Sequence, residues 1–493
     1  MSDLLVLHPD DDVAILTAAR KGLSAGHKIA RHPIAMGRAV RKFGQIIGTA
    51  QTDIAEGDHV HSHNLAMSAH QTHHDIGGTL DTARAAVTPR APGKFKGYRR
   101  KDGRVGIRNY VVLCATVNCS ATVIRQAAEE AERRGMLDAF PNVDGVIAVA
   151  HGTGCGMAAK GPGWDNLQRV LWGYATHPNT GAAIFVGLGC EVMQIAQMQA
   201  RFGQGRSHAF HGLTIQDNGG TRTTIEAILA KLETLLPEVN DVTREDCPSP
   251  ELMIGLQCGG SDGLSGVTAN PALGLAVDRL VAEGGTAILS ETPEIYGAES
   301  LLLSRAVSRD VGQKLLDRLD WWETYTRMNG AEMDNNPSPG NKAGGLTTIL
   351  EKSLGAVAKA GNGPLADVVE YGQTVTERGL IFMDTPGFDP VSATGQIAGG
   401  AHLIVFTTGR GSAFGSKPAP TLKLATNDKL YRSMRDDMDI NCGDILTGDS
   451  TLDAKGEEIY DAILAAASGD ATKSEALGLG DHECVPWQIG AVM

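Results

Sequence analysis

The chain is poor in the features that mark membrane, secreted and nucleic-acid-binding proteins. Aromatic residues make up 5% of its 493 residues, and no run of about 18 apolar residues predicts a membrane span. The opening MSDLLVLHPDDD lacks the basic region of a secretory signal. A formal net charge of -13 argues against a general nucleic-acid binder, which needs a basic face. We therefore expect a cytoplasmic protein that binds neither nucleic acid nor membranes.

Several well-known catalytic motifs are also missing. The sequence contains no P-loop, no GxSxG and no HExxH. GTGCG and GLG are similar to dinucleotide-binding loops, but the full GxGxxG with its downstream acid is absent, which argues against a nicotinamide cofactor. Eight cysteines in a long cytosolic chain do not form a disulfide framework. Metal binding, catalysis or burial in the core remain as their roles.

The order of apolar runs and glycine-rich loops predicts an α/β protein of several domains. Residues 1–75 read as a small β-rich module, and the Ala-, Pro- and Gly-rich residues 76–95 as a linker. A strand–loop–helix rhythm follows, which predicts one α/β domain over 96–245 and a C-terminal α/β catalytic domain over 246–493, both with mostly parallel sheets.

Four cysteines directly follow apolar runs that we expect to be strands: Cys119, Cys155, Cys190 and Cys258. In open α/β sheets, ligands bind beyond the carboxyl ends of the strands, so these loops could assemble one site. Three or four thiolates could hold iron or an iron–sulfur cluster. The spacing is not a CxxC signature, and burial of each cysteine as a small apolar residue is the alternative.

Histidines and isolated basic residues form a second group of candidates. HVHSHN places His59, His61 and His63 on one face of an expected strand, where they could bind a divalent metal or an acidic ligand together with His8 or His27. A polar exposed strand face is the alternative.

Two glycine-rich loops each present a cation. Lys342, next to Asn341 in NPSPGNKAGG, and Arg410, in TTGRGS, suit clamps for a carboxylate, the alternative being solvated loop cations. Glu291 and Glu294 in SETPE could bind metal or sugar hydroxyls, or could simply form an acidic pair at a helix N-terminus.

Several long motifs together resemble one family. HPDDDVAI, GHKIA and DIAEGDHVHSHN resemble the N-terminal SAF-type (β-clip) module of altronate dehydratases. GYRRKDGRVGIRN, GLGCE, CGGSDGLSGVTANP, NPSPGNKAGG, EKSLG and FTTGRGSAFG resemble the catalytic part of the altronate/galactarate dehydratase family. The resemblance implies a lyase that removes water from a sugar acid to give a 2-keto-3-deoxy acid, with iron (Fe²⁺ or an iron–sulfur cluster) or Mn²⁺ as cofactor.

The family also contains sulfolactate sulfo-lyases, which expel sulfite instead of water. A sulfo-lyase and a non-catalytic sugar-acid-binding protein therefore remain alternatives, and we expect a homo-oligomer with a small-molecule sugar acid as its partner.

A metal-assisted β-elimination would use the candidate residues in three roles. We expect His151, Lys342 and Arg410 to act in catalysis, and the four strand-end cysteines to hold the metal. The expected substrate-binding residues are His61, His63, Asn64, Ser261, Asp262, Asn270 and Asn341.

Overall fold

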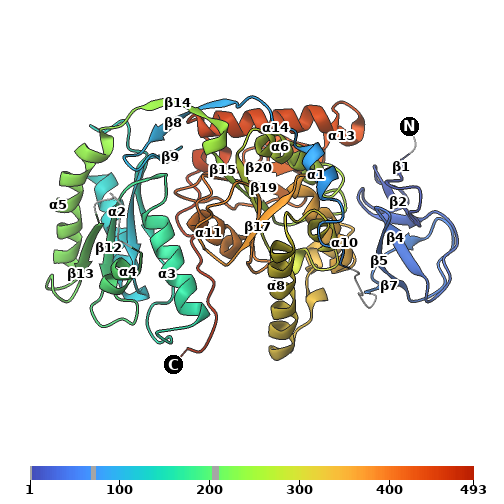
Figure 1. Ribbon diagram of the computed structural model, residues 1–493, viewed down its shortest axis with the longest axis horizontal. Coiled ribbons are helices and arrows are strands. Elements are labelled where there is room, and N and C mark those ends of the chain that lie inside the picture. The colour runs from blue at the N-terminus through green and yellow to red at the C-terminus, as the bar shows by residue number, and fades with distance from the viewer. Residues whose placement is uncertain (1–2, 68–73, 203–209, 493) are drawn as a thin grey trace.

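Three bodies lie in a row in the computed structural model, which describes residues 3–67, 74–202 and 210–492. Figure 1 shows a β-rich module at one end, an α/β domain at the other, and a larger α/β domain between them. The C-terminal tail runs between the two α/β domains. The predicted fold class, a β-rich module followed by α/β domains with mostly parallel sheets, is confirmed.

The N-terminal module consists of two small antiparallel sheets, ordered β1-β2-β3-β6 and β4-β5-β7. Its strands are β1 (Leu4–Leu5), β2 (Val13–Leu16), β3 (Lys28–Ala30), β4 (Ala39–Lys42), β5 (Gln45–Ala50), β6 (His59–Val60) and β7 (Leu65–Ala66). Val40, Ile47 and Val60 of the module belong to the same apolar core as Leu354 and Val357 of the central domain. The module is therefore packed onto that domain through a common core.

The expectation that His59, His61 and His63 share one face of a strand is wrong. The strand β6 ends at Val60, and residues 61–64 form a turn. The side chain of Asn64 braces this turn, because its Oδ1 accepts from the His61 N–H at 2.9 Å and its Nδ2 donates to the His59 carbonyl at 3.0 Å. Asparagine favours turns through such side-chain bonds to nearby backbone.

The second domain carries a four-stranded parallel sheet in the order β11-β10-β12-β13. All six residues of its central strand β10 are buried, as expected for a parallel strand covered on both faces. Its elements are β10 (Tyr110–Ala115), α2 (Asn118–Arg133), β11 (Gly145–Val149), α3 (Pro162–Ala175), β12 (Thr180–Gly187), α4 (Ile195–Phe202), β13 (Phe210–Thr214) and α5 (Thr221–Asn240).

A small antiparallel sheet, β14-β8-β9, joins the two α/β domains. Its strands are β8 (Lys94–Arg99), β9 (Val105–Gly106) and β14 (Arg244–Pro248), and the helix α1 (Leu80–Ala86) lies within the segment expected to be a linker. The second and central domains also share an apolar core, in which Val112 and Phe185 lie with Ile288 and Phe406. Among the described helices, none combines the length and apolar character that a bilayer span requires.

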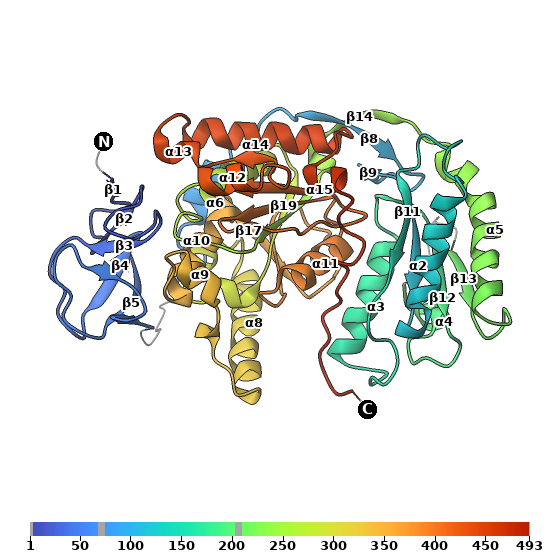
Figure 2. The same cartoon turned by 180° about the vertical axis from the view of Figure 1, so that it is seen from behind.

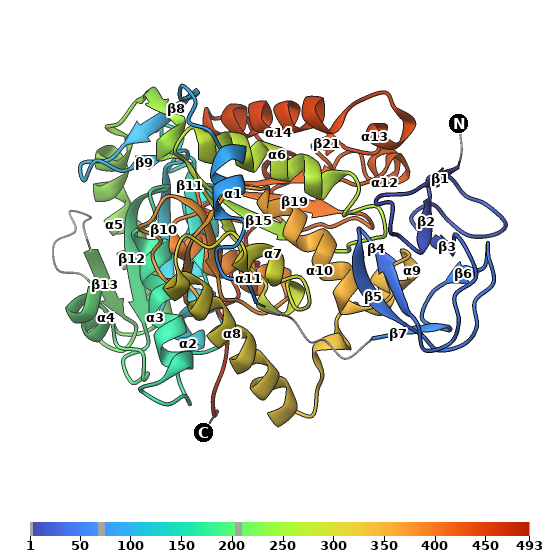
Figure 3. The same cartoon turned by 45° about the vertical axis from the view of Figure 1, so that its right-hand side comes forward.

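The central domain is built on a seven-stranded sheet in the order β17-β18-β16-β15-β19-β20-β21, in which every pair is parallel. Its strands are β15 (Met253–Cys258), β16 (Thr286–Leu289), β17 (Leu365–Val369), β18 (Gly379–Met383), β19 (Leu403–Thr408), β20 (Thr421–Ala425) and β21 (Ile440–Asn441). Its helices are α6 (Ala269–Ala282), α7 (Ser300–Leu303), α8 (Arg309–Met328), α9 (Pro339–Ala343), α10 (Ile349–Val357), α11 (Asp389–Gly399), α12 (Asp428–Ser433), α13 (Asp444–Thr447), α14 (Leu452–Ala467) and α15 (Lys473–Ala476). Figures 2 and 3 show the module beside α9 and α10 from two further directions.

Candidate functional site

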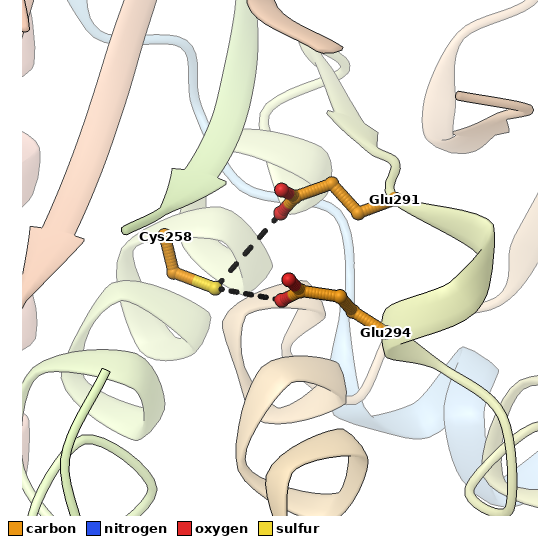
Figure 4. Close-up of side chains that lie close together, drawn as sticks. All are labelled: Cys258, Glu291 and Glu294. Atoms are coloured by element: carbon orange, nitrogen blue, oxygen red, sulfur yellow. Dashed lines mark hydrogen bonds between the residues drawn. The ribbon is translucent and has the colours of Figure 1, made fainter. Parts of the chain in front are cut away.

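Three side chains meet at the carboxyl ends of neighbouring strands of the seven-stranded sheet. Cys258 ends β15, and Glu291 and Glu294 follow the adjacent strand β16. Figure 4 shows the three side chains converging: the Cys258 Sγ lies 3.5 Å from a Glu294 oxygen and 3.9 Å from a Glu291 oxygen. All three residues are buried. The strand ends thus gather acidic groups at the edge where open α/β sheets bind their ligands.

Two buried lysines complete this group. The Lys359 Nζ donates to the Cys258 Sγ at 2.8 Å and lies 3.6 Å from a Glu291 oxygen. The Lys352 Nζ donates to the Glu294 Oε1 at 2.6 Å and to the Asn336 Oδ1 at 2.8 Å. We call Cys258, Glu291, Glu294, Lys352 and Lys359 the buried charge cluster.

The protonation states of the cluster follow from burial and from its two ammonium groups. Burial raises the pKa of the Cys258 thiol to about 12, so the thiol is protonated at neutral pH. Burial, reinforced by the neighbouring Glu294, also raises the pKa of Glu291. Burial opposes ionisation of Glu294 too, but Lys352 and Lys359 outweigh it and hold its pKa below the ordinary value. Glu294 is therefore the ionised carboxylate of the pair.

The ligand atoms of the cluster are spaced as in a metal site, but a lysine ammonium already lies beside them. Ligand atoms of Cys258, Glu291 and Glu294 lie within 4.8 Å of one another, and within the described residues no other such group of histidine, cysteine and acidic side chains is found. One oxygen of Glu291 is buried without a hydrogen-bond partner. However, the ammonium of Lys359 already contacts both Cys258 and Glu291, where a metal cation would lie. The residues present therefore fit a network of lysine and carboxylate side chains better than a metal centre.

Glu291 adopts an unusual backbone conformation. Its φ of 72° lies in the left-handed region, which is rare for residues other than glycine. The backbone N–H of Glu291 donates to the Thr385 hydroxyl at 2.9 Å, and the N–H of Thr292 donates to the Thr385 carbonyl at 2.9 Å. Such strain persists only where surrounding contacts determine it, and it is common at functional sites.

The structure does not bring the four predicted cysteine ligands together. Cys258 is buried in the central domain, whereas three cysteines of the second domain are exposed: Cys119 in the first turn of α2, which follows β10, and Cys155 and Cys190 on the loops after β11 and β12. The segment of Cys155 contacts the other two: the Asn118 N–H donates to the Thr153 carbonyl at 2.9 Å, and the Val192 N–H donates to the Gly154 carbonyl at 3.1 Å. Any shared site of the three exposed thiols therefore belongs to a different sheet from Cys258.

His151 lies with these second-domain loops, away from the predicted clamps. Its Nε2 lies 2.8 Å from the Ala115 carbonyl oxygen, and its Nδ1 accepts from the Thr153 N–H at 3.3 Å. Burial lowers the pKa of His151 to about 4, so the ring is neutral. Both ring nitrogens thus bind backbone, and in this structure the ring holds a loop in place.

The N-terminal module docks against a second group of predicted residues. Asn341 donates to the Ser261 carbonyl at 2.8 Å, and His61 of the module lies with its Nε2 2.8 Å from the Lys342 carbonyl oxygen. A side chain at Gly263 would meet the Gly26 carbonyl oxygen at 2.0 Å, so the two backbones touch where only glycine fits. Module and central domain therefore meet at residues 261–263 and at residues 341–345, which are the end of α9 and the two glycines after it.

The remaining predicted residues divide between this junction and the interior. The carboxylate of Asp262 accepts from the Thr426 hydroxyl and from the Asn427 amide, both at 3.1 Å. Lys342 is half-buried and Arg410 is exposed. Asn270 is buried, and its amide donates to the Gly355 carbonyl and accepts from the Thr407 hydroxyl, so both of its polar atoms already bind protein. His63 is exposed in the turn after β6.

A buried ion triad fastens the module to the central domain. Lys28 and Lys42 of the module each donate to the carboxylate of Glu351 in α10, both at 2.8 Å. A cavity of about 10 Å³, which is room for a single water, lies between this triad and the buried charge cluster. Glu351 and Lys352 both line it.

Sequence reasoning missed the lysines and the acid that organise both networks. All five of these residues are buried: Lys28, Lys42, Glu351, Lys352 and Lys359. One signal was present: ILEKSLGAVAKA is an apolar helical run in which only three residues are charged. Charged residues inside a helix that is otherwise apolar all round are expected to pair within the core.

Comparison with known proteins matches each of the three domains to one family. A model described as "D-galactarate/Altronate dehydratase, C-terminal" matches residues 249–492. Models for the second domain of D-galactarate dehydratase/altronate hydrolase and for the altronate/galactarate dehydratase SAF domain match residues 97–240 and 7–68. The chain belongs to the D-galactarate/altronate dehydratase family. The predicted resemblance is confirmed, and the β-rich module is the SAF domain of this family.

Relatives in this family cover nearly all of the chain. It is 38% identical to galactarate dehydratase (L-threo-forming) of Escherichia coli over 470 residues, or 93% of this chain and 89% of the relative. It is 35% identical to altronate dehydratase of Bacillus subtilis over 456 residues, or 92% and 89%. It is also 32% identical to the beta subunit of (2R)-sulfolactate sulfo-lyase of Chromohalobacter salexigens over 389 residues, or 78% and 95%.

Proposed function

We propose that the protein is a hydro-lyase that dehydrates an altronate- or galactarate-like sugar acid to a 2-keto-3-deoxy acid. The observation that carries this proposal is the family membership, together with relatives over about nine-tenths of the chain that are named as dehydratases. The junction of module and central domain supports it. Lys342 lies at that junction, and Arg410 lies beside Gly260, next to the loop of Ser261 and Asp262.

The reaction is a β-elimination, and it sets clear demands on the site. The proton on the carbon next to the carboxylate leaves, a carbon–carbon double bond forms, and the hydroxyl on the following carbon departs as water. The enol that results rearranges to the 2-keto acid. Because the carboxylate is already charged, removal of the proton places a second negative charge on the same group, which nearby cations must stabilise. We assign that role to Lys342 and Arg410.

A divalent metal would assist departure of the hydroxyl. We propose iron, with manganese as the alternative, because a Lewis acid lowers the barrier to loss of hydroxide. An iron–sulfur cluster on Cys119, Cys155 and Cys190 is a second arrangement, favoured by three exposed thiols on adjoining segments at the carboxyl ends of β10, β11 and β12. Iron and acid-labile sulfide measured on anaerobically purified protein separate the two, since only the cluster contains sulfide.

A panel of aldonic and aldaric acids tests the proposed function. Formation of a 2-keto-3-deoxy acid, detected by a colour reaction, is the expected result for at least one of them. Sulfolactate belongs in the same panel with a sulfite readout, because one relative is a sulfo-lyase subunit. Sulfite release without dehydration of any sugar acid would replace the proposal with the sulfo-lyase function, and binding without turnover would make the chain a sugar-acid-binding protein.

Arg410→Ala tests the clamp once a substrate is known. A charge-assisted bond to a carboxylate contributes about 1.5–3 kcal/mol, so kcat/KM is expected to fall about 10- to 150-fold. Arg133→Ala is the matched control, because Arg133 is an exposed arginine of the second domain that pairs only with Glu130. An Arg410→Ala enzyme as active as the control would remove Arg410 from the site.

A further inference from the structure

A cavity of about 180 Å³ lies where the second domain, the central domain and the C-terminal tail meet. Its walls include residues of α3, of α8, and Trp487 and Ile489 of the tail. Figures 1 and 2 show the tail passing between α3 and α8. Glu370 and Asp384, which also line the cavity, directly follow β17 and β18. The cavity therefore lies at the carboxyl edge of the seven-stranded sheet, where open α/β sheets bind their ligands.

The wall formed by the tail is held in place by close contacts. A side chain at Gly163 in α3 would meet the Ile489 carbonyl oxygen at 2.1 Å, so helix and tail touch where only glycine fits. The Trp487 N–H donates to the Tyr371 hydroxyl at 3.1 Å, and this hydroxyl donates to the Val391 carbonyl at 2.8 Å. The cavity is therefore preformed, as most small-molecule sites are.

A buried amide lines this cavity without a partner in the protein. Asn166 of α3 is 4% exposed, and across the described residues its side chain makes no hydrogen bond. Buried polar side chains nearly always have a partner, because an unmet donor or acceptor costs folding free energy. An amide offers an acceptor oxygen and two N–H donors. All of these are available to a molecule inside the cavity.

An arginine and an aspartate present further unused groups. The Arg318 guanidinium lies 3.9 Å from the Asp384 Oδ2 atom, which is too far for a hydrogen bond. The Oδ1 atom of Asp384 accepts from the Thr292 hydroxyl at 2.6 Å and from the Trp322 N–H at 2.8 Å, so the carboxylate is fixed. A hydroxyl group can accept from a guanidinium and donate to a carboxylate at the same time. The pair is therefore spaced for a ligand hydroxyl between its two members.

The other charged residues around the cavity are already neutralised. The side chain of Arg169 lies 2.5 Å from a Glu370 oxygen, and that of Asp165 lies 2.6 Å from the Arg201 guanidinium. With the arginine–aspartate pair described above, each positive charge faces a negative one. A charged ligand would find no unpaired opposite charge, so the cavity favours a neutral molecule.

Two indole rings form a corner of the cavity. Trp321 and Trp487 both line it, with ring centroids 5.7 Å apart and ring planes at 89°. Trp321 stacks on Tyr325, and Trp487 stacks on Trp322. Perpendicular indoles do not form the parallel sandwich that would hold a flat ring, such as a nucleobase, on both faces. Apolar indole surface beside fixed polar groups suits a saturated ring with C–H bonds on its faces and hydroxyls around its rim.

We propose that this cavity binds a neutral monosaccharide in its ring form. Asn166, Arg318 and Asp384 would hold its hydroxyls, and Trp321 and Trp487 would contact its C–H face. The volume agrees with this class, because it exceeds the ~10–15 Å³ that one water needs and lies below the ~300–1,000 Å³ of sites for drug-sized ligands.

The site goes beyond the proposed function and does not rest on it. The dehydration acts on a charged acid, which we assigned to Lys342 and Arg410, whereas the ligand of this cavity is uncharged. Titration of the full-length protein with D-glucose, D-galactose and D-mannose, followed by calorimetry and thermal melts, tests the site. At least one of the three is expected to bind and to raise the melting temperature as its concentration increases. Acyclic galactitol and charged D-galacturonate should bind more weakly than that hexose.

Asn166→Leu separates a ligand-binding role from a structural one. Leucine keeps the branching of asparagine but has no polar atoms, so hexose binding should weaken about 5- to 100-fold. Without sugar, the variant should melt at the same or a higher temperature, because a buried amide without a partner is removed. Arg318→Gln should also weaken binding. Arg327→Gln is the matched control, because Arg327 is an exposed arginine of the same helix whose Nε donates to the Glu323 carbonyl.

Three outcomes would overturn the site: no binding of any of the three hexoses, equal hexose binding by Asn166→Leu and by the control, or tighter binding of D-galacturonate than of the neutral sugars. Circular dichroism of each variant shows whether it is folded, and Arg318→Gln takes the place of Asn166→Leu in the comparison if the latter is not.

Discussion

Replacement of Glu351 by glutamine tests how the SAF domain is held. The side chains of Lys28, Lys42 and Glu351 are 0%, 2% and 0% exposed, and each lysine lies 2.8 Å from a different Glu351 oxygen. Glu351 also accepts from the Thr347 N–H and hydroxyl, at 2.9 and 2.7 Å. Glutamine preserves the shape of the side chain but leaves two buried ammonium groups facing a neutral amide.

The expected loss of stability is about 3–5 kcal/mol, the cost of removing one partner from a buried ion pair. The sign of the pH dependence supports the same assignment. Burial opposes ionisation of Glu351, but Lys28 and Lys42 outweigh it and lower its pKa below the ordinary value. A carboxylate with a lowered pKa stabilises the folded state above the unfolded pKa of about 4.3, and this contribution is lost as the pH falls below it. The difference between the variant and the unaltered protein should therefore shrink in acid.

Urea unfolding at neutral and acid pH, with hydrogen exchange of the β3 amides as a local probe, measures the effect. Glu130→Gln is the matched control, since its exposed pairs with Arg133 and Arg134 should contribute nothing measurable. Lys28→Met, Lys42→Met and Glu351→Leu combined should restore most of the stability, because replacing a whole buried ion group by apolar side chains is often neutral. A loss below about 1 kcal/mol for Glu351→Gln alone would refute the reasoning.

Two further predictions concern the joint between the α/β domains. Burial lowers the pKa of His402 to about 4, so folding stability should fall by up to about 1.4 kcal/mol per pH unit as the pH drops from about 6.5 toward 4. His402→Asn should reduce this pH dependence in thermal melts, and an unchanged pH dependence would contradict the prediction. Trp487 of the C-terminal tail stacks on Trp322, with ring centroids 5.3 Å apart, so Trp487→Ala should destabilise the protein by about 2–3 kcal/mol in urea unfolding. An unchanged free energy of unfolding would show that the tail does not contribute to stability.

The architecture could be predicted from the sequence because it depends on local patterns. Continuous apolar runs that end in glycine-rich loops are typical of buried parallel strands, and β10, β12 and β15 arise from such runs. The helix α3 has a start that local patterns do not indicate. It begins at Pro162 between two glycines, residues that usually end helices, although proline is well tolerated in the first turn.

The site was predictable only in part, because its contacts join residues far apart in the chain. The glycine-rich loops identified Ser261, Asn341 and Lys342, which the structure does bring to one junction. No local pattern links Cys258 to Lys359, which lie 101 residues apart, or Lys28 to Glu351, which lie 323 apart. The histidine motif failed as a strand for a local reason, since the Asn64 side chain competes for the backbone and closes a turn.

The ion triad has a consequence for how genes of this family can be arranged. The SAF domain carries Lys28 and Lys42, and the rest of the chain carries Glu351, so either part alone would expose charges that only the other part neutralises. A gene divided between the codons for residues 67 and 74 would therefore encode two obligate subunits. Each would need the other at the moment of folding, and the pair would assemble without any covalent connection.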